Sequence, residues 1–363
     1  MRTRWIVAAA LAWAAAVFVT AVLAVRLAPD DRSIDGHWNA SLDRYAAVAP
    51  LAHWDSYWYW RIAEDGYRWS NDRKMHSVAF FPLYPMILAA VRGVVHPFVA
   101  GEIVSLLALV AAAVAVARHA ESCGFDARWT LAALLLFPKA MYFLAAYTES
   151  LFLLLAAACL LAARRGKFGW AAAAGFLAAL TRPTGIVLAL PLAGAAWERS
   201  REGDRRTGHW WPVLAPVAGA AAFGAFLWAR FGSPLVGVRT EAVAWGHRVF
   251  EWPGQSLAAA FEPHGRPFRV TLFFFAAFAA AGVVLWRRRL RVEALYVLGS
   301  IAFVVETGAL ASGPRYTAVL YPAFFVFGDA MRRWKPVRWS YLTLGGAALL
   351  YETVKFSLGG WVS

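Results

Sequence analysis

Apolar runs long enough to cross a membrane recur along almost the whole chain, separated by short polar and basic segments. A helix needs about 20 apolar residues to span a bilayer, and no soluble core of this size needs so many such runs. The first run, Trp5 to Val25, follows two arginines and predicts a retained helix over about 5–27. A cleaved signal peptide has a similar layout, but its apolar core is usually shorter. The pattern therefore predicts an all-α polytopic membrane protein.

Basic residues form short clusters between the apolar runs and account for the net charge of +14. Lys and Arg favour the cytoplasmic ends of spans, so these clusters indicate orientation, and we expect no nucleic-acid partner. With the amino terminus in the cytoplasm, residues 28–78 form the first extracytoplasmic loop, whose eight acidic and six basic residues suit that side. The remaining predicted spans are 98–118, 128–146, 148–163, 168–181, 184–197, 210–230, 269–286, 291–311, 315–331 and 339–357.

This arrangement predicts about 11 transmembrane helices, within a range of 10–13, in a single integral membrane domain over 1–363. The apolar segment 79–95 is broken by prolines and is predicted to be re-entrant or interfacial, because a crossing there would place the arginine clusters outside. A second large extracytoplasmic loop covers 231–268. The arms 168–181 and 184–197 are short for spans, which indicates either a binding cavity or local thinning of the bilayer.

The most unusual segment is 54–60, where five aromatic residues surround Asp55. Aromatic side chains favour the membrane–water interface, and a carboxylate among them is a candidate for chemistry. We predict a helix over about 50–65, with Pro50 in its first turn and Gly66 as its C-cap. Aromatic residues lie on every side of that helix, so we expect it to lie in the interface, partly covered by other spans.

Four more charged residues fall near predicted span ends on the extracytoplasmic side. Arg182 and Arg315 are candidates for clamping a phosphate through paired hydrogen bonds, with Lys139 as a point charge. Lys139 can instead extend to the interface without a function, and Glu149 can either cap a helix or orient a sugar. Asp55 is the candidate general base for an acceptor hydroxyl.

The sequence has no dinucleotide-binding glycine pattern, no P-loop and no Asp-x-Asp pair. A soluble nucleotide donor has no evident site, so a membrane-borne donor is the simpler hypothesis. No cofactor is required by these residues, and no metal ligand set is indicated, although a divalent metal stays open.

Several short blocks, in order, resemble the PIG-V-like mannosyltransferases, relatives of the second mannosyltransferase of glycosylphosphatidylinositol anchor synthesis. The blocks are Trp54-Asp55 with Trp58-Tyr59, Ile62-Ala63 and Gly66-Tyr67; 80–85; Phe137-Pro138; 147–152; 180–185; and Pro314-Arg315-Tyr316. Lys139 departs from the family pattern, which has a small residue after this proline.

The resemblance implies a GT-C glycosyltransferase fold and inverting transfer of a hexose, most simply mannose, from a polyprenyl-phosphate carrier. It implies Asp55 as the catalytic base on the extracytoplasmic side. Arg315, Arg182, Lys139, Glu149 and Tyr316 are then the candidates for binding the donor phosphate or sugar. The candidates for an acceptor or interface wall are Trp54, Trp58 and Tyr59. Expected partners are the lipid-linked donor, a glycolipid or glycan acceptor, and membrane lipids.

The Ala- and Arg-rich composition is typical of a high-GC bacterium, which suggests the bacterial plasma membrane as the location. The alternative function is a transporter or flippase for a polyprenyl-linked sugar, in which Asp55 would bind substrate or couple protons. Short broken helices fit that alternative too. The lopsided outer loops and the lack of an internal repeat in the sequence argue against it.

Overall fold

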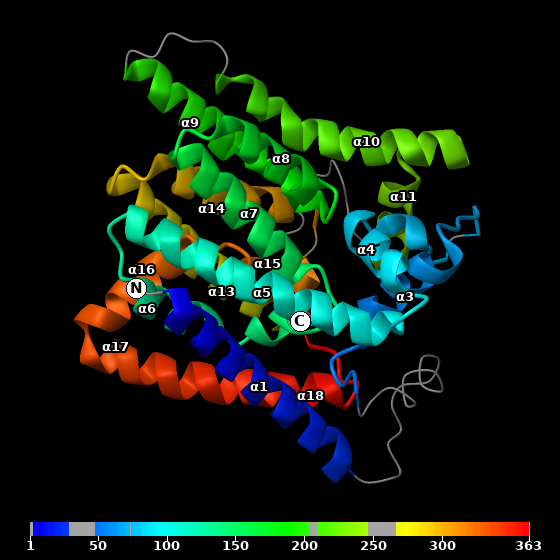
Figure 1. The fold of residues 1–363 in the computed structure, drawn as a ribbon, viewed down its shortest axis with the longest axis horizontal. Helices are drawn as coiled ribbons and strands as arrows, with labels where there is room; N and C mark the ends of the chain where they lie inside the picture. The colour runs from blue at the N-terminus through cyan, green and yellow to red at the C-terminus, as the bar shows by residue number, and fades with distance from the viewer. Residues whose placement is uncertain are drawn as a thin grey trace. The chain divides into compact units, whose positions relative to one another are not determined.

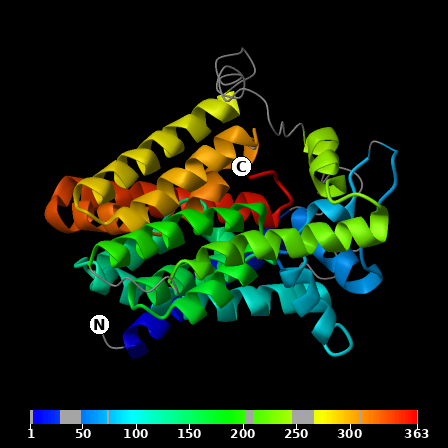
Figure 2. The same ribbon diagram turned by 90° about the horizontal axis from the view of Figure 1, so that it is seen from above.

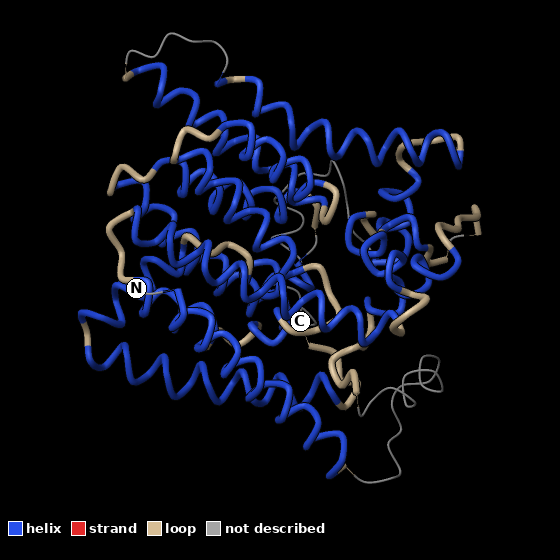
Figure 3. The backbone as a smooth tube through the Cα atoms, in the orientation of Figure 1, coloured by secondary structure: helices blue, strands red, loops and turns tan. Residues whose placement is uncertain are grey.

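The computed structural model describes residues 3–28, 48–72, 74–202, 209–245, 266–308 and 310–362. These residues form helices joined by turns, with no strand among them (Figure 3). The prediction of an all-α protein is therefore confirmed for the part of the chain that the structure describes. The chain divides into two compact units, the first made of 1–66, 84–154 and 327–362, and the second of 67–83 and 155–326.

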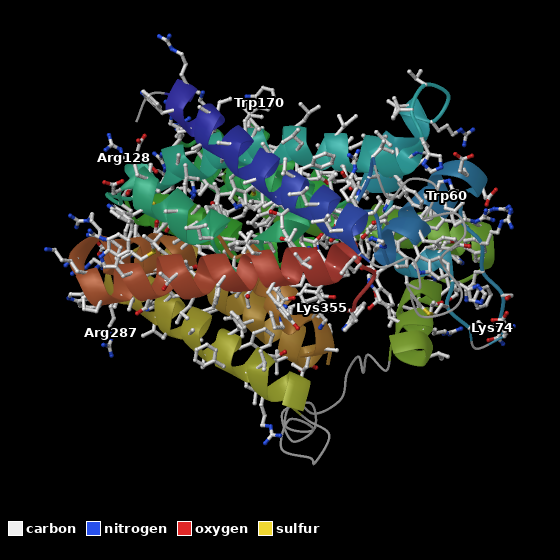
Figure 4. The ribbon with its side chains drawn as sticks, turned by 90° about the horizontal axis from the view of Figure 1, so that it is seen from below. Trp60, Lys74, Arg128, Trp170, Arg287 and Lys355 are labelled. Carbon is white, nitrogen blue, oxygen red and sulfur yellow. The ribbon has the colours of Figure 1, made fainter. Side chains whose placement is uncertain are left out.

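The first unit is built on α1 (Thr3–Leu27), which packs against α5 (Pro97–Ser122) and α18 (Gly346–Ser357) (Figure 1). Arg118, near the end of α5, donates a hydrogen bond to Thr3 Oγ1 at 2.8 Å, so α1 and α5 are antiparallel. At the other end of α5, Phe98 packs against Trp60 of α3 (Asp55–Asp65), with ring centroids 5.3 Å apart. Trp60 and Arg128 lie on opposite sides of this unit (Figure 4). Helix α3 therefore lies at the end of the unit opposite the start of α1.

Two predicted spans are interrupted at prolines. The segment 128–146 contains α6 (Ala127–Leu135), a turn through Pro138 and a short 3-10 helix, η2 (Ala140–Phe143), before α7 (Glu149–Arg164) begins. Proline has no backbone N–H to donate to the preceding turn of a helix. The predicted span 128–146 is therefore not one continuous helix, and its assignment as a crossing stays a prediction. The predicted span 315–331 likewise divides before Pro322 into α15 (Gly313–Ala318) and α16 (Ala323–Arg333).

In the second unit, the short arms of the sequence prediction appear as α8 (Phe168–Ala179) and as η3 (Pro183–Leu188) followed by α9 (Ala189–Arg201). Helix α10 (Leu214–Phe231) packs along α8 (Figure 1). Helices α13 (Arg266–Arg287) and α14 (Arg291–Glu306) also lie side by side (Figure 2). The remaining described helices are η1 (Ser77–Ala79), α4 (Leu83–Val91), η5 (Trp211–Val213), α11 (Val236–Trp245), η7 (Leu310–Ser312), α17 (Lys335–Ser340) and the π-helical turn η8 (Tyr341–Gly345).

Four helices among the described residues are long and apolar enough to cross a membrane: 3–27, 97–122, 211–231 and 269–287. They correspond to four of the predicted spans. The other predicted crossings contain shorter helices, so the total of about 11 stays a prediction. Helix α4 has nine residues, well below the length needed to span, and the re-entrant assignment of 79–95 stays a prediction too. Much of the predicted outer loop 231–268 lies outside the described residues.

Candidate functional site

Asp55 is the first residue of α3 and follows a turn with an unusual backbone conformation. Trp54, the residue before it, has φ 53° and ψ −110°. A residue with a side chain rarely adopts positive φ, since such a conformation costs on the order of 1–3 kcal/mol and persists only where surrounding contacts offset that cost. The helix ends at Gly66, as predicted, with φ 76°. Its predicted start at Pro50 is wrong, because the backbone is not helical at Trp54.

The start of α3 is fixed by the segment that precedes α7. The first N–H groups of a helix have no acceptor within the helix. Here the Asp55 N–H donates to the Tyr147 hydroxyl at 3.1 Å, and the Ser56 hydroxyl donates to the Ala146 carbonyl oxygen at 3.1 Å. Tyr147 is almost fully buried, so its oxygen is held in place from the interior side. Two residues from the same segment therefore set the position of the half-buried Asp55.

Glu149 lies at the first position of α7 and is completely buried. An acidic side chain in the first turn of a helix interacts favourably with the helix dipole, which fits the capping interpretation. Its place two residues after Tyr147 also puts it in the segment that contacts the start of α3. Both roles proposed from the sequence stay open on this geometry.

The three residues predicted to form an acceptor or interface wall have different surroundings. Trp54 packs edge-to-face against Trp361, with ring centroids 5.1 Å apart. Trp58 is half-buried, and its ring packs against that of Tyr57 on the same helix. Tyr59 is buried and packs against the rings of Tyr84 and Tyr147 in the interior of the first unit. Tyr59 therefore anchors α3 to the protein, whereas Trp54 and Trp58 remain partly accessible.

Lys139 is paired within the protein. Its ammonium lies 2.9 Å from Glu352 Oε1 of α18, and the side chains are only 5% and 18% exposed. The pair joins the turn after α6 to a helix 213 residues further along the sequence. Lys139 was predicted as a donor-phosphate ligand, and the structure assigns it a protein partner that the sequence analysis did not name.

Replacement of Lys139 by Met is expected to destabilise the protein, because it leaves Glu352 charged in a largely buried place. Loss of one partner from a buried ion pair costs about 3 kcal/mol or more. Thermal unfolding in detergent should show a lower Tm, and the double variant with Glu352→Gln should recover much of it. Lys335→Met, at an exposed position on α17, is the control. If Lys139→Met has the wild-type Tm and a raised KM for a phosphate-bearing donor, the phosphate-binding prediction is favoured instead.

Arg182 and Arg315, in the second unit, meet at one aromatic ring. Their guanidinium carbons lie 5.0 Å and 5.7 Å from the centroid of the Tyr316 ring. Both arginine side chains belong to buried residues, with exposures of 4% and 8%. Guanidinium groups interact favourably with the faces of aromatic rings. The structure thus brings together at one ring three of the residues predicted to bind the donor, two of which carry a positive charge.

Local sequence features place both arginines. Arg182 precedes Pro183, and a residue before proline is restricted to extended conformations; its φ and ψ are −155° and 151°. Arg315 lies in α15, which begins at Gly313. A Cβ on Gly313 would lie 2.1 Å from Thr271 Cγ2 of α13, so only glycine permits this close approach. These features fix the backbone at and near the two arginines.

Two acidic residues important for the first unit were missed by the sequence analysis. Glu352 pairs with Lys139, and Glu102 of α5 accepts a hydrogen bond from the Leu51 N–H at 2.7 Å, just before the Asp55 turn. Both acids occur inside apolar stretches that were predicted as spans. A charged residue in such a stretch is costly unless it has a partner, and that signal was available in the sequence.

The apolar helices of spanning length indicate an integral membrane protein. It has two candidate sites, an aspartate at a strained turn and a pair of buried arginines beside one aromatic ring. Residues 17–189 match the family model described as mannosyltransferase (PIG-V). This match supports a PIG-V-like mannosyltransferase family for the chain and confirms the resemblance for the motifs between residues 54 and 185. No curated protein matches the chain significantly.

The matched range contains Asp55, Lys139, Glu149 and Arg182. Arg315 and Tyr316 lie outside it, as does the whole of α18. The family match therefore covers Asp55, the segment 146–147 that bonds to the start of α3, and one of the two arginines beside Tyr316.

Proposed function

We propose that this protein is an inverting glycosyltransferase that transfers mannose from a polyprenyl-phosphate carrier to a lipid-linked or glycan acceptor. The observation that carries the proposal is the family match over residues 17–189, which supports mannose transfer and includes Asp55. Polyprenyl phosphate as the carrier is supported by the spanning-length helices and by the lack of a nucleotide-binding pattern in the sequence.

In this mechanism, the acceptor hydroxyl oxygen attacks the anomeric carbon of the sugar while its proton passes to the Asp55 carboxylate. The bond between the anomeric carbon and the phosphate oxygen breaks, and the polyprenyl phosphate leaves with the electron pair. Attack from the side opposite the leaving group inverts the configuration. The negative charge on the departing phosphate needs a fixed cation, which is the role predicted from the sequence for Arg182 and Arg315.

We place the reaction on the extracytoplasmic side of a bacterial plasma membrane, with the amino terminus in the cytoplasm. Arg2 and Arg4 precede α1, which supports a cytoplasmic start for this helix. The Asp55 end of the first unit is opposite the start of α1, as the antiparallel packing of α1 and α5 requires. The bacterial location rests on composition alone.

The test is a transfer assay with purified protein and a membrane lipid extract as acceptor. Polyprenyl-phosphate mannose, polyprenyl-phosphate glucose and GDP-mannose are offered as separate radiolabelled donors. We expect mannose transfer from the first donor and none from GDP-mannose. Transfer from GDP-mannose alone would overturn the carrier assignment. Movement of the lipid-linked sugar across vesicle membranes without any transfer would favour the flippase alternative.

A further inference from the structure

The segment 356–362, which we call the 356–362 hook, packs directly against the turn that carries Asp55. Helix α18 ends at Ser357, and Gly359 has φ 80°. The Gly359 N–H donates to the Phe356 carbonyl at 2.9 Å, and the Gly360 N–H donates to the Lys355 carbonyl at 2.8 Å. This pattern of hydrogen bonds around a left-handed glycine closes a helix and reverses the chain direction. The reversal brings Trp361 and Val362 back toward the body of the first unit.

Each part of the hook has a partner near Asp55. Buried His53 donates from Nε2 to the Ser357 carbonyl at 3.2 Å, and its ring packs against Phe356 at 5.6 Å. The ring of Trp54 packs edge-to-face on that of Trp361. The hook therefore contacts both residues that immediately precede the catalytic candidate.

The far side of the hook is tied to the segment that holds the Asp55 N–H. The Tyr142 hydroxyl donates to the Val362 carbonyl, and the rings of Tyr142 and Tyr147 both pack against Phe356. Tyr147 is the residue whose hydroxyl accepts from Asp55. The positive φ of Trp54 persists only if surrounding contacts hold it, and the hook supplies those contacts on one side while Tyr147 supplies them on the other.

We infer that the 356–362 hook is a positioning element for Asp55, with Trp361 as its principal contact. The inference rests on the proposed role of Asp55 as general base. The hook lies outside the range of the family match, so this role is assigned by the contacts of this chain. Displacement of a catalytic group by about 1 Å can lower a rate by about a hundredfold. Loss of a contact that positions Asp55 is therefore expected to lower kcat.

The experiment compares Trp361→Ala with Trp361→Phe and with Trp339→Ala, an exposed tryptophan on α17. Amide hydrogen exchange of residues 53–57 is measured without substrate, and kcat and KM are measured for mannose transfer. We expect Trp361→Ala to accelerate exchange in this segment and to lower kcat about 10- to 100-fold at unchanged KM values. Trp361→Phe, which keeps an aromatic ring, should restore most of both properties, and Trp339→Ala should change neither.

The inference is overturned if residues 53–57 of Trp361→Ala exchange their amide hydrogens at the wild-type rate. It is also overturned if exchange is faster but kcat equals that of the wild type. A fall in activity matched by an equal loss of folded protein would also overturn it, because that result indicates a general structural role. The general-base role of Asp55 fails separately, if the Asp55→Asn variant transfers mannose at close to the wild-type rate, and the proposed function fails if the wild-type protein transfers no mannose. The exchange measurement does not depend on either outcome.

Discussion

Asp55→Asn is expected to lower kcat for mannose transfer by about a hundred- to ten-thousandfold, because the amide has the same shape but cannot accept the acceptor's proton. The backbone N–H of residue 55 should keep its bond to Tyr147, so folding and donor KM should change little. The measurement is steady-state transfer with polyprenyl-phosphate mannose. The Asp55→Asn substitution removes a single proton-accepting group and leaves the strained turn intact.

The matched control is Asp65→Asn, which changes an aspartate on the same helix that pairs with Arg61 near its exposed end. Surface ion pairs of this kind contribute little to stability, so this variant should transfer mannose at nearly the wild-type rate. Asp55→Asn activity within a fewfold of wild type would contradict the general-base assignment. Equal loss in both variants would indicate that α3 is merely sensitive to change.

Arg182→Met and Arg315→Met are each expected to lower kcat/KM for the lipid-phosphate donor by about a hundredfold or more. Loss of one fixed group that stabilises developing negative charge typically has an effect of this size. Lysine at either position should recover only part of the activity, because an ammonium lacks the planar fork that binds two phosphate oxygens and stacks on an aromatic ring. The assay is the dependence of the transfer rate on donor concentration.

Arg201→Met provides the control for the arginine variants. Arg201 also lies over an aromatic ring, with its guanidinium carbon 4.9 Å from the centroid of Trp197, but it is exposed. We expect wild-type donor dependence in this variant. Unchanged donor kinetics in both Arg182→Met and Arg315→Met would exclude the arginine pair as the phosphate site and would leave the Asp55 assignment untouched.

The sequence predicted local features of both candidate sites well. Gly66 ends α3 because a glycine readily takes positive φ, and Arg182 is extended because proline follows it. The start of α3 was predicted five residues too early, since Pro50 is compatible with a first helical turn but does not enforce one. The helix begins only after Trp54, where contacts from other segments impose a backbone that no local propensity favours.

The partners of the charged residues could not be predicted from the sequence, for a different physical reason. The residues around Lys139 in the sequence are compatible both with a side chain that extends to lipid headgroups and with one that pairs with an acid. Only the packing of this turn against α18 makes Glu352 its partner. Arg182 and Arg315 were each recognised as candidates, yet nothing in either motif specifies that both approach Tyr316.

The sequence by itself determined the helical class, the membrane setting and the motifs of the family, because hydrophobic periodicity and proline and glycine act over a few neighbouring residues. The tertiary structure alone decided what surrounds Asp55. Tyr147 and the 356–362 hook reach it from distant parts of the chain, and such contacts depend on how helices pack rather than on any one segment. Together they hold Trp54 at a backbone angle that an isolated segment would not keep.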